Sequence, residues 1–237
     1  MQSVTSVSIG YISLGYKLCL NGDAEMTVMS NEEYVESIYA GDVDLTRAIE
    51  GIRAKGMPEI SIAPGYGRLL TLLVQASGAQ RILEIGALGG YSGICLARGL
   101  QENGRLLSLE LQQEYADVAY THLQLAGLGD KVGYRIGDAM VTLPELVNEG
   151  ARFDFFFIDA DKGSYPEYLD YAIELSNPGA IIVGDNSFMH GRTMDPSQNS
   201  NSVKAVRRFN ERMAMDPRLE STILPAYDGL AIARVRA

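Results

Sequence analysis

Short apolar runs alternate with amphipathic segments along the chain from Arg81 to the C-terminus. Runs such as 153–159 (FDFFFID) and 180–185 (AIIVGD) are almost entirely aliphatic or aromatic up to a final acid, which is typical of strands buried on both faces of a parallel sheet. Between these runs, apolar residues recur at the spacing of a helix. This alternation predicts a doubly wound α/β fold with right-handed crossovers.

The predicted strands form one mostly parallel, seven-stranded sheet. Five of them alternate with helices and cover residues 81–86, 104–110, 131–136, 153–159 and 180–185. The last two, 221–225 and 230–235, flank Ala226–Gly229, which has the composition of a hairpin turn. We expect this C-terminal hairpin to add an antiparallel strand at one edge of the sheet.

The part of the chain before the first strand is predicted to be mainly helical. Ser30 and Glu33 have the spacing of a capping box, which is a signal for the start of a helix. The helical pattern continues to Lys55 with a break near Gly41, and it resumes over 67–79. These helices are expected to cover the sheet or an oligomeric partner.

The domain organisation follows from where the periodicity begins. Residues 1–28 show no clear periodicity, and no repeat, low-complexity tract or linker interrupts the rest of the 237-residue chain. We therefore expect an N-terminal extension over residues 1–30 and a single domain over residues 31–237.

Charge and hydropathy argue against several classes of partner. The formal net charge of −10 disfavours nucleic acid, because a phosphate backbone is bound by a basic surface. No apolar run reaches the ~18–20 residues that span a bilayer, and the N-terminus lacks the leading positive charge of a secretory signal. Two cysteines are too few for a disulfide framework, and Cys95 lies in an apolar helical segment. This usage favours a buried reduced thiol and a cytoplasmic location.

An acidic residue stands at the carboxyl end of each predicted parallel strand, where an open α/β sheet binds its ligand. These residues are Glu84, Glu110, Asp138, Asp159 and Asp185. Glu110 is at the position from which an acid accepts hydrogen bonds from ribose hydroxyls, and Asp138 can accept one from the exocyclic amine of adenine. Each of these two can instead cap or face the following helix, so both alternatives stay open.

The turn after the first strand indicates which nucleoside ligand is favoured. It begins at Gly86 with the pattern G-x-x-G-G, whereas a dinucleotide-binding turn has the pattern G-x-G-x-x-G. Glu84 would repel a pyrophosphate but suits an ammonium group. S-adenosylmethionine carries an ammonium group and a positive sulfonium and has no phosphate. The turn therefore favours S-adenosylmethionine over NAD, and an NAD-dependent reductase is the less favoured alternative.

The segments FFFIDADK and GDN contain the most specific set of polar residues. Asp159, Asp185 and Asn186 offer three oxygen ligands at the ends of neighbouring predicted strands, and Mg²⁺ prefers such oxygens. Lys162 follows in the first segment and can act on a substrate hydroxyl as a base, or as a cation beside an oxyanion. The alternatives are a helix cap or salt-bridge partner for Asp159 and a solvated surface position for Lys162.

These motifs, in this order, resemble the cation-dependent class I S-adenosylmethionine O-methyltransferases, the family that includes catechol and caffeoyl-CoA O-methyltransferases. The resemblance covers residues 31–236 and rests on ISIAPGYGRLLTLL, RILEIGALGGYSG, LLSLELQQEYA, IGDA, FDFFFIDADK, GAIIVGDN and DGLAIARV. It implies a Rossmann-like methyltransferase fold, S-adenosylmethionine and a divalent cation (Mg²⁺) as cofactors, and a homodimer. The residues that would contact S-adenosylmethionine are Ile62, Glu84, Gly86, Tyr91, Ser92, Glu110, Asp138, Ala139 and Asp159.

The resemblance also implies how the reaction is divided among residues. Asp159, Asp185 and Asn186 would hold the metal, and Lys162 would remove the proton from the methylated hydroxyl, with Asp159 beside the reacting centre. The expected function is transfer of a methyl group from S-adenosylmethionine to one hydroxyl of a catechol-type phenolic small molecule. Two alternatives stay open: a metal-independent O-methyltransferase acting on a non-catechol hydroxyl, and a protein that binds S-adenosylmethionine without turnover.

Overall fold

The computed structural model describes residues 29–236 of the chain. These described residues fall into two units, 29–40 and 41–236. The expectations for residues 1–28 lie outside the described residues, and the predicted division into an extension and a single domain stays a prediction.

Helix α1 (Asn31–Ile38) belongs to the first unit and begins at the expected capping box. The Ser30 hydroxyl accepts a hydrogen bond from the Glu33 amide at 3.1 Å, and the Glu33 carboxylate accepts one from the Ser30 amide at 2.8 Å. Two backbone donors that a helix N-terminus leaves unpaired are thereby satisfied. The predicted start of this helix is confirmed.

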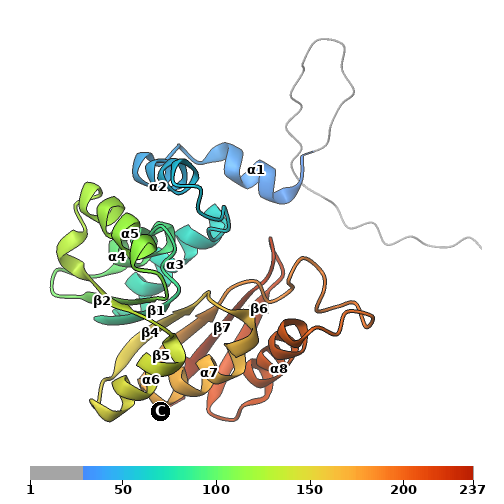
Figure 1. Ribbon diagram of the computed structural model, residues 1–237. Helices are drawn as coiled ribbons and strands as arrows, with labels where there is room; N and C mark the ends of the chain where they lie inside the picture. Colours follow the sequence, from blue (N-terminus) through green and yellow to red (C-terminus); the bar gives the residue numbers. More distant parts are fainter. Residues whose placement is uncertain (1–28, 237) are drawn as a thin grey trace, which may run out of the picture. The chain divides into compact units, whose positions relative to one another are not determined.

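The second unit is a seven-stranded sheet between two layers of helices (Figure 1). Its strands are β1 (Arg81–Ile85), β2 (Arg105–Glu110), β3 (Val132–Ile136), β4 (Phe153–Ile158), β5 (Ser176–Gly184), β6 (Leu219–Leu224) and β7 (Leu230–Val235). The order is β3-β2-β1-β4-β5-β7-β6. Strands β1 to β5 are parallel, and β7 pairs antiparallel with both β5 and β6. The predicted doubly wound sheet with a C-terminal edge hairpin is confirmed.

The helices of this unit are α2 (Val43–Ala54), α3 (Pro64–Ser77), α4 (Tyr91–Gly99), α5 (Gln113–Leu125), α6 (Ala139–Asn148), α7 (Tyr165–Glu174) and α8 (Asn201–Met215). Two short 3-10 helices, η1 (Gly129–Lys131) and η2 (Lys162–Ser164), precede β3 and α7. No helix in the described part of the chain is long and apolar enough to cross a membrane.

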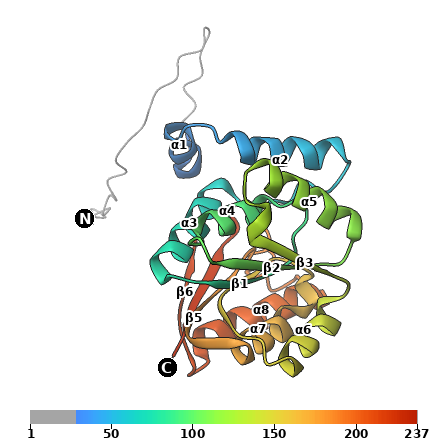
Figure 2. The ribbon, with the colours of Figure 1, turned by 90° about the vertical axis from the view of Figure 1, so that its left-hand side faces the viewer.

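Strand β4 illustrates how the sheet is buried on both faces. Phe155 and Phe157 pack with residues of α3, α4 and α5, whereas Phe156 and Ile158 pack with residues of α6, α7 and α8. Figure 2 shows these two groups of helices on opposite sides of the sheet. All four side chains are completely buried, and each such burial stabilises the fold by about 1.5–3 kcal/mol. The strand that carries Asp159 at its end is therefore held firmly from both sides.

The starts of α3 and β5 differ from the prediction by three or more residues, for local reasons. Helix α3 begins at Pro64 rather than at residue 67, because a proline in the first helical turn lacks only an N–H that would have no partner there. It ends at Ser77 and is capped by Gly78, whose φ of +67° gives the left-handed conformation that glycine adopts easily. Strand β5 begins at Ser176 rather than at residue 180, because Ser176 already pairs with Phe153 before a register shift.

Cys95 is buried in α4 and forms no disulfide, as predicted. Burial raises the pKa of its thiol to about 12. Because the thiolate is the reactive form of cysteine, this residue acts as a core side chain.

Candidate active site

A cavity of about 490 Å³ lies beyond the carboxyl ends of strands β1 to β4. Five residues predicted to contact the cofactor line it: Gly86, Glu110, Asp138, Ala139 and Asp159. They come from the ends of four parallel strands. The cavity therefore occupies the position at which an open parallel sheet binds its ligand.

Gly86 brings the turn after β1 close to the end of β4. Its φ is +100°, and a Cβ at this position would overlap with the carbonyl oxygen of Asp159. Its amide donates a hydrogen bond to the Leu109 carbonyl at 2.9 Å. Only glycine combines this backbone conformation with this close approach, so Gly86 sets the width of the cavity between the first and fourth strands.

Glu110 holds the glycine turn from the side of β2. Its Oε2 accepts hydrogen bonds from the amides of Ala87 at 3.1 Å and Leu88 at 2.9 Å, and its Oε1 accepts one from the Gln112 amide at 3.0 Å. A carboxylate offers about four acceptor sites. One site is left over for a ribose hydroxyl, so Glu110 can support the turn and bind a nucleoside at the same time.

Asp138 caps helix α6 and also lines the cavity. Its Oδ1 accepts a hydrogen bond from the Met140 amide at 2.8 Å, which is the helix-cap alternative considered from the sequence. The side chain is exposed beside Ala139 on the cavity wall. The cap and a contact with a ligand are therefore compatible.

Glu84 does not line this cavity, although it lies in the strand that leads to the glycine turn. Its carboxyl group is completely buried and accepts hydrogen bonds from the hydroxyl groups of Ser92, at 2.5 Å, and Ser108. Burial raises the pKa of Glu84 to about 7, in spite of these two hydrogen bonds. Glu84 and Ser92 thus form a buried polar pair behind the turn, and their predicted contact with the cofactor stays a prediction.

The raised pKa of Glu84 makes the stability of the cofactor-free protein depend on pH. The folded protein retains a proton on Glu84 that the unfolded chain loses near the ordinary value of 4.5, so stability decreases as the pH rises from about 4.5 to about 7. Glu84→Gln cannot ionise, so this loss of stability with rising pH, on the order of 3 kcal/mol, is absent from the variant. Urea unfolding at several pH values should give a flatter profile for the variant, and superimposable profiles would contradict the assignment.

Ile62 and Tyr91 line a separate, smaller cavity of about 190 Å³. It is formed with Ile49, Ile52, Glu59, Ser61, Ala63 and Pro64, from α2, the segment after it and the first residue of α3. The nine residues predicted to contact the cofactor therefore fall into three groups: five on the large cavity, two on this small one, and two buried behind the turn. The structure does not bring all of them to one surface.

Asp159 and Asp185 directly follow paired residues of two adjacent parallel strands, β4 and β5. Ile158 pairs with Gly184 in the register of β4 and β5, and the Asp185 amide donates a hydrogen bond to the Ile158 carbonyl at 3.1 Å. Asp185 is 4% exposed. Its burial, and then the charge of Asp159, raise the pKa of Asp185 above the usual range of an aspartic acid. The predicted pair of carboxylates is thus close together, in a place where negative charge is unfavourable.

Asn186 follows Asp185 with a φ of +55°. Its amide nitrogen donates a hydrogen bond to Asp228 Oδ2 at 3.2 Å. Asp228 lies in the turn between β6 and β7, and its Oδ1 accepts a second hydrogen bond from the His190 amide at 2.5 Å. With the nitrogen assigned to Asp228, the carbonyl oxygen is the atom that Asn186 can offer to a cation.

Lys162 is held between Asp159 and a tyrosine that the sequence did not single out. Its Nζ lies 2.7 Å from Asp159 Oδ1 and donates to Tyr165 Oη at 2.5 Å. Tyr165 is completely buried, and its hydroxyl lies 3.1 Å from the Ile158 carbonyl and 3.2 Å from the Asp185 carbonyl. Tyr165 thus connects Lys162 to the ends of both strands that carry the aspartates.

Comparison with known proteins identifies the class of this site. Residues 41–236 match the family model described as O-methyltransferase. The chain belongs to this O-methyltransferase family. Catechol O-methyltransferase of Niastella koreensis is 41% identical over 214 residues, which cover 87% of this chain and 97% of the relative. Catechol O-methyltransferase of Mycobacterium tuberculosis is 39% identical, with 86% and 94% covered.

Solved structures of O-methyltransferases share the same fold. The O-methyltransferase from Bacillus cereus in complex with SAH has a TM-score of 0.81 and 40% identity, and the match covers 86% of this chain and 96% of that one. TomG from Streptomyces achromogenes, solved in complex with SAM, has a TM-score of 0.80 and 36% identity, with 88% and 100% covered. The predicted family is confirmed, and the chain is an S-adenosylmethionine-dependent O-methyltransferase.

Several residues of the O-methyltransferase cavity were missed in the sequence because they are apolar or aromatic. Ile60 and Leu111 line the cavity, and each is 67% exposed. Tyr115 and Tyr168 line it as well. Large apolar side chains left exposed beside a cavity are typical of ligand-contacting positions. An apolar residue directly after Glu110, where a strand gives way to a helix, was the signal that could have indicated Leu111.

Proposed function

We propose that this O-methyltransferase transfers a methyl group from S-adenosylmethionine to one hydroxyl of a catechol-type small molecule, assisted by a divalent cation. The observation that carries the proposal is the carboxylate pair at the ends of adjacent strands, the part-buried Asp159 and the buried Asp185, with Lys162 2.7 Å from Asp159. Two relatives that match nearly their full length are named catechol O-methyltransferase, which supports the same substrate class.

The donor set at these strand ends fits a divalent cation. No group of three His, Cys, Asp or Glu side chains that could hold a metal ion occurs among residues 29–236, so the set would consist of two carboxylates, Asp159 and Asp185, and the carboxamide of Asn186. These are hard oxygen ligands of the kind that Mg²⁺ binds through one or two carboxylates while keeping other positions for water or substrate. The buried charge of Asp185 beside Asp159 is also what a cation would offset.

The cation, when bound, would acidify a catechol hydroxyl and orient both catechol oxygens. Lys162 would use its Nζ to accept the proton of the hydroxyl that is methylated. Asp159 and Tyr165 hold Nζ at this end of the site. Because Tyr165 Oη also contacts the carbonyls of Ile158 and Asp185, it would keep Nζ in a fixed position relative to both carboxylates. A vicinal diol would place both of its oxygens on the cation, with the methylated hydroxyl facing Lys162.

The cofactor would lie against the other half of the site. Glu110 would bind the ribose with its remaining acceptor site, Asp138 and Ala139 would border the adenine, and Gly86 would allow the cofactor to approach the end of β4. Asp159 lines the same cavity and so would connect the two halves. The methionine end of the cofactor would be contacted by the remaining predicted residues, Ile62, Glu84, Tyr91 and Ser92. We also propose a homodimer, which the family resemblance implies, and a cytoplasmic location, which the cysteine usage favours. Sedimentation velocity tests the dimer.

A substrate panel tests this function directly. The protein is incubated with S-adenosylmethionine, Mg²⁺ and either a catechol or the matched monophenol, and products are identified by mass spectrometry. We expect singly methylated product from vicinal diols and none from monophenols. Equal turnover of the monophenols would instead favour a metal-independent O-methyltransferase acting on a non-catechol hydroxyl. Cofactor binding without product from any phenol would favour a binding protein.

A further inference from the structure

The glycine turn of the cofactor cavity is held from a second side by a histidine of α5. His122 is 7% exposed, and its Nδ1 lies 2.8 Å from the carbonyl oxygen of Gly89. Since a carbonyl can only accept, Nδ1 carries the proton in this contact. Glu110 supports the first half of the turn through the amides of Ala87 and Leu88. His122 therefore supports the half of the turn that Glu110 does not reach.

Helix α2 packs against both members of this contact. A Cβ at Gly51 would overlap with the imidazole of His122, and a Cβ at Gly89 would overlap with the side chain of Ile52. Ile52 is 1% exposed. Both glycines are thus required by close packing, and the contact between His122 and Gly89 is enclosed by one turn of α2.

Helix α2 is itself fixed by an arginine of α4. The Nη2 of Arg98 donates hydrogen bonds to Asp44 Oδ2 at 2.8 Å and to Asp42 Oδ1 at 3.1 Å. Asp42 caps the N-terminus of α2. The pairing is part-buried, and hydrogen bonding to Arg98 lowers the pKa of Asp42. Helix α2 is therefore anchored independently of the glycine turn, and it can hold the turn and His122 in place.

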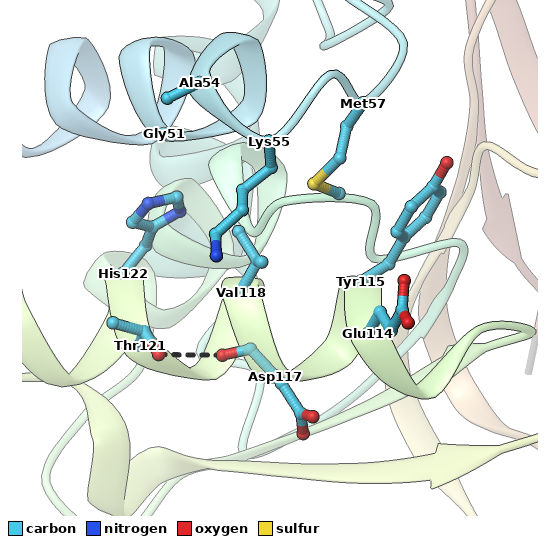
Figure 3. A pocket seen from close by; sticks show the side chains of 10 residues that line it. All are labelled: Gly51, Ala54, Lys55, Met57, Glu114, Tyr115, Asp117, Val118, Thr121 and His122. Carbon is cyan, nitrogen blue, oxygen red and sulfur yellow. Dashed lines mark hydrogen bonds between the residues drawn. The ribbon is translucent and has the colours of Figure 1, made fainter.

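His122 also lines a second cavity, outside the one that holds the predicted cofactor contacts. Figure 3 shows His122 at one end of a cavity of about 650 Å³ between α2 and α5, beside Lys55, with Tyr115 at the other end. Tyr115 also lines the cofactor cavity. The hydrogen bond to Gly89 is the specific contact that the imidazole makes.

We propose that His122 is a positioning residue for S-adenosylmethionine, which holds the glycine turn in its binding conformation through the Gly89 carbonyl. The role depends on cofactor binding alone and requires neither the metal nor the catechol substrate. His122 itself would not touch the cofactor, since it does not line the cofactor cavity. The effect should therefore appear in cofactor affinity and not in the chemical step.

Three variants separate the hydrogen bond from the packing. His122→Leu keeps an apolar side chain of similar reach but lacks the donor, whereas His122→Asn places an amide N–H near the position of Nδ1. Gly51→Ala leaves the histidine in the chain and pushes against its ring. Gly41→Ala is the matched control, because nothing lies within 4 Å of a Cβ there.

Isothermal titration with SAH and steady-state kinetics against S-adenosylmethionine give the readout. We expect His122→Leu and Gly51→Ala to raise the Kd for SAH and the KM for S-adenosylmethionine about five- to tenfold, the equivalent of one lost hydrogen bond. The kcat at saturating cofactor and the KM of the phenolic substrate should not change. His122→Asn and Gly41→Ala should bind SAH like the wild type.

Unchanged SAH affinity in His122→Leu would overturn the proposal. Equal loss of affinity in His122→Asn and His122→Leu would also overturn it, because that result would indicate a packing role. Should His122→Leu fail to fold, as judged by circular dichroism, Gly51→Ala and His122→Asn decide the question together. Because SAH titration requires no turnover, absence of catechol methylation in the substrate panel would leave this test intact.

Discussion

Replacing Asp185 with asparagine is expected to weaken Mg²⁺ binding and to lower kcat for catechol methylation by at least about a hundredfold. The substitution removes one of the two carboxylates at the ends of β4 and β5. It also removes a buried charge next to Asp159, which is unfavourable without a cation. The variant without metal should therefore be at least as stable as the wild type, although it loses activity. Mg²⁺ titration calorimetry, initial rates and thermal melts measure the three quantities.

Asp130→Asn is the matched control for this experiment, because Asp130 is exposed on η1, away from the ends of these strands. It should retain both Mg²⁺ affinity and rate. If Asp185→Asn bound Mg²⁺ as tightly as the wild type, the assignment of Asp185 as a ligand would be wrong. A lower melting temperature in the absence of metal would contradict the argument about the buried charge.

Replacing Lys162 with methionine is expected to lower kcat about 10²–10⁴-fold, the usual contribution of a positioned base. Methionine retains an unbranched side chain over the Tyr165 ring, which Lys162 Nζ approaches to 4.6 Å from the centroid. Because Lys162 does not line the cofactor cavity, the KM for S-adenosylmethionine should not change. Single-turnover rates with saturating cofactor measure the effect on chemistry.

Lys162→Arg distinguishes a base from a structural cation. Arginine preserves the positive charge beside Asp159 but does not give up its proton in proteins, so this variant should be as impaired as Lys162→Met. Recovery of activity in the arginine variant would show that the residue serves only as a charge partner. Lys204→Met, on the exposed side of α8, is the control and should behave as the wild type.

The fold could be predicted from the sequence because its main signals are local. Strands that are buried on both faces, such as β4, consist mostly of apolar residues whatever they pack against. The composition of the turn at Ala226–Gly229 likewise predicts the C-terminal hairpin. The location of the cavity could be predicted as well, because an acid at the end of each strand is also a local signal. Gly86, Glu110 and Asp138 line it as a consequence of topology alone.

The roles of individual side chains depended on contacts between distant parts of the chain. The sequence predicts that Glu84 contacts the cofactor, which stays a prediction, but it does not indicate that Ser108, on the neighbouring strand, and Ser92, in the following helix, donate hydrogen bonds to its carboxyl group. Tyr165 and His122 carry no signal in the sequence, since a tyrosine or histidine within a helix is usually part of the core. Their importance follows from hydrogen bonds to backbone atoms of other elements.

The most direct test of the proposed function measures catechol methylation after chelation and after return of metal. The purified protein is treated with excess EDTA, dialysed, and assayed with saturating S-adenosylmethionine and a catechol over a range of Mg²⁺ concentrations. The adjacent carboxylates of Asp159 and Asp185 predict that activity is lost in EDTA and returns with saturating dependence on Mg²⁺. Full catechol turnover in excess EDTA would contradict the metal-assisted mechanism.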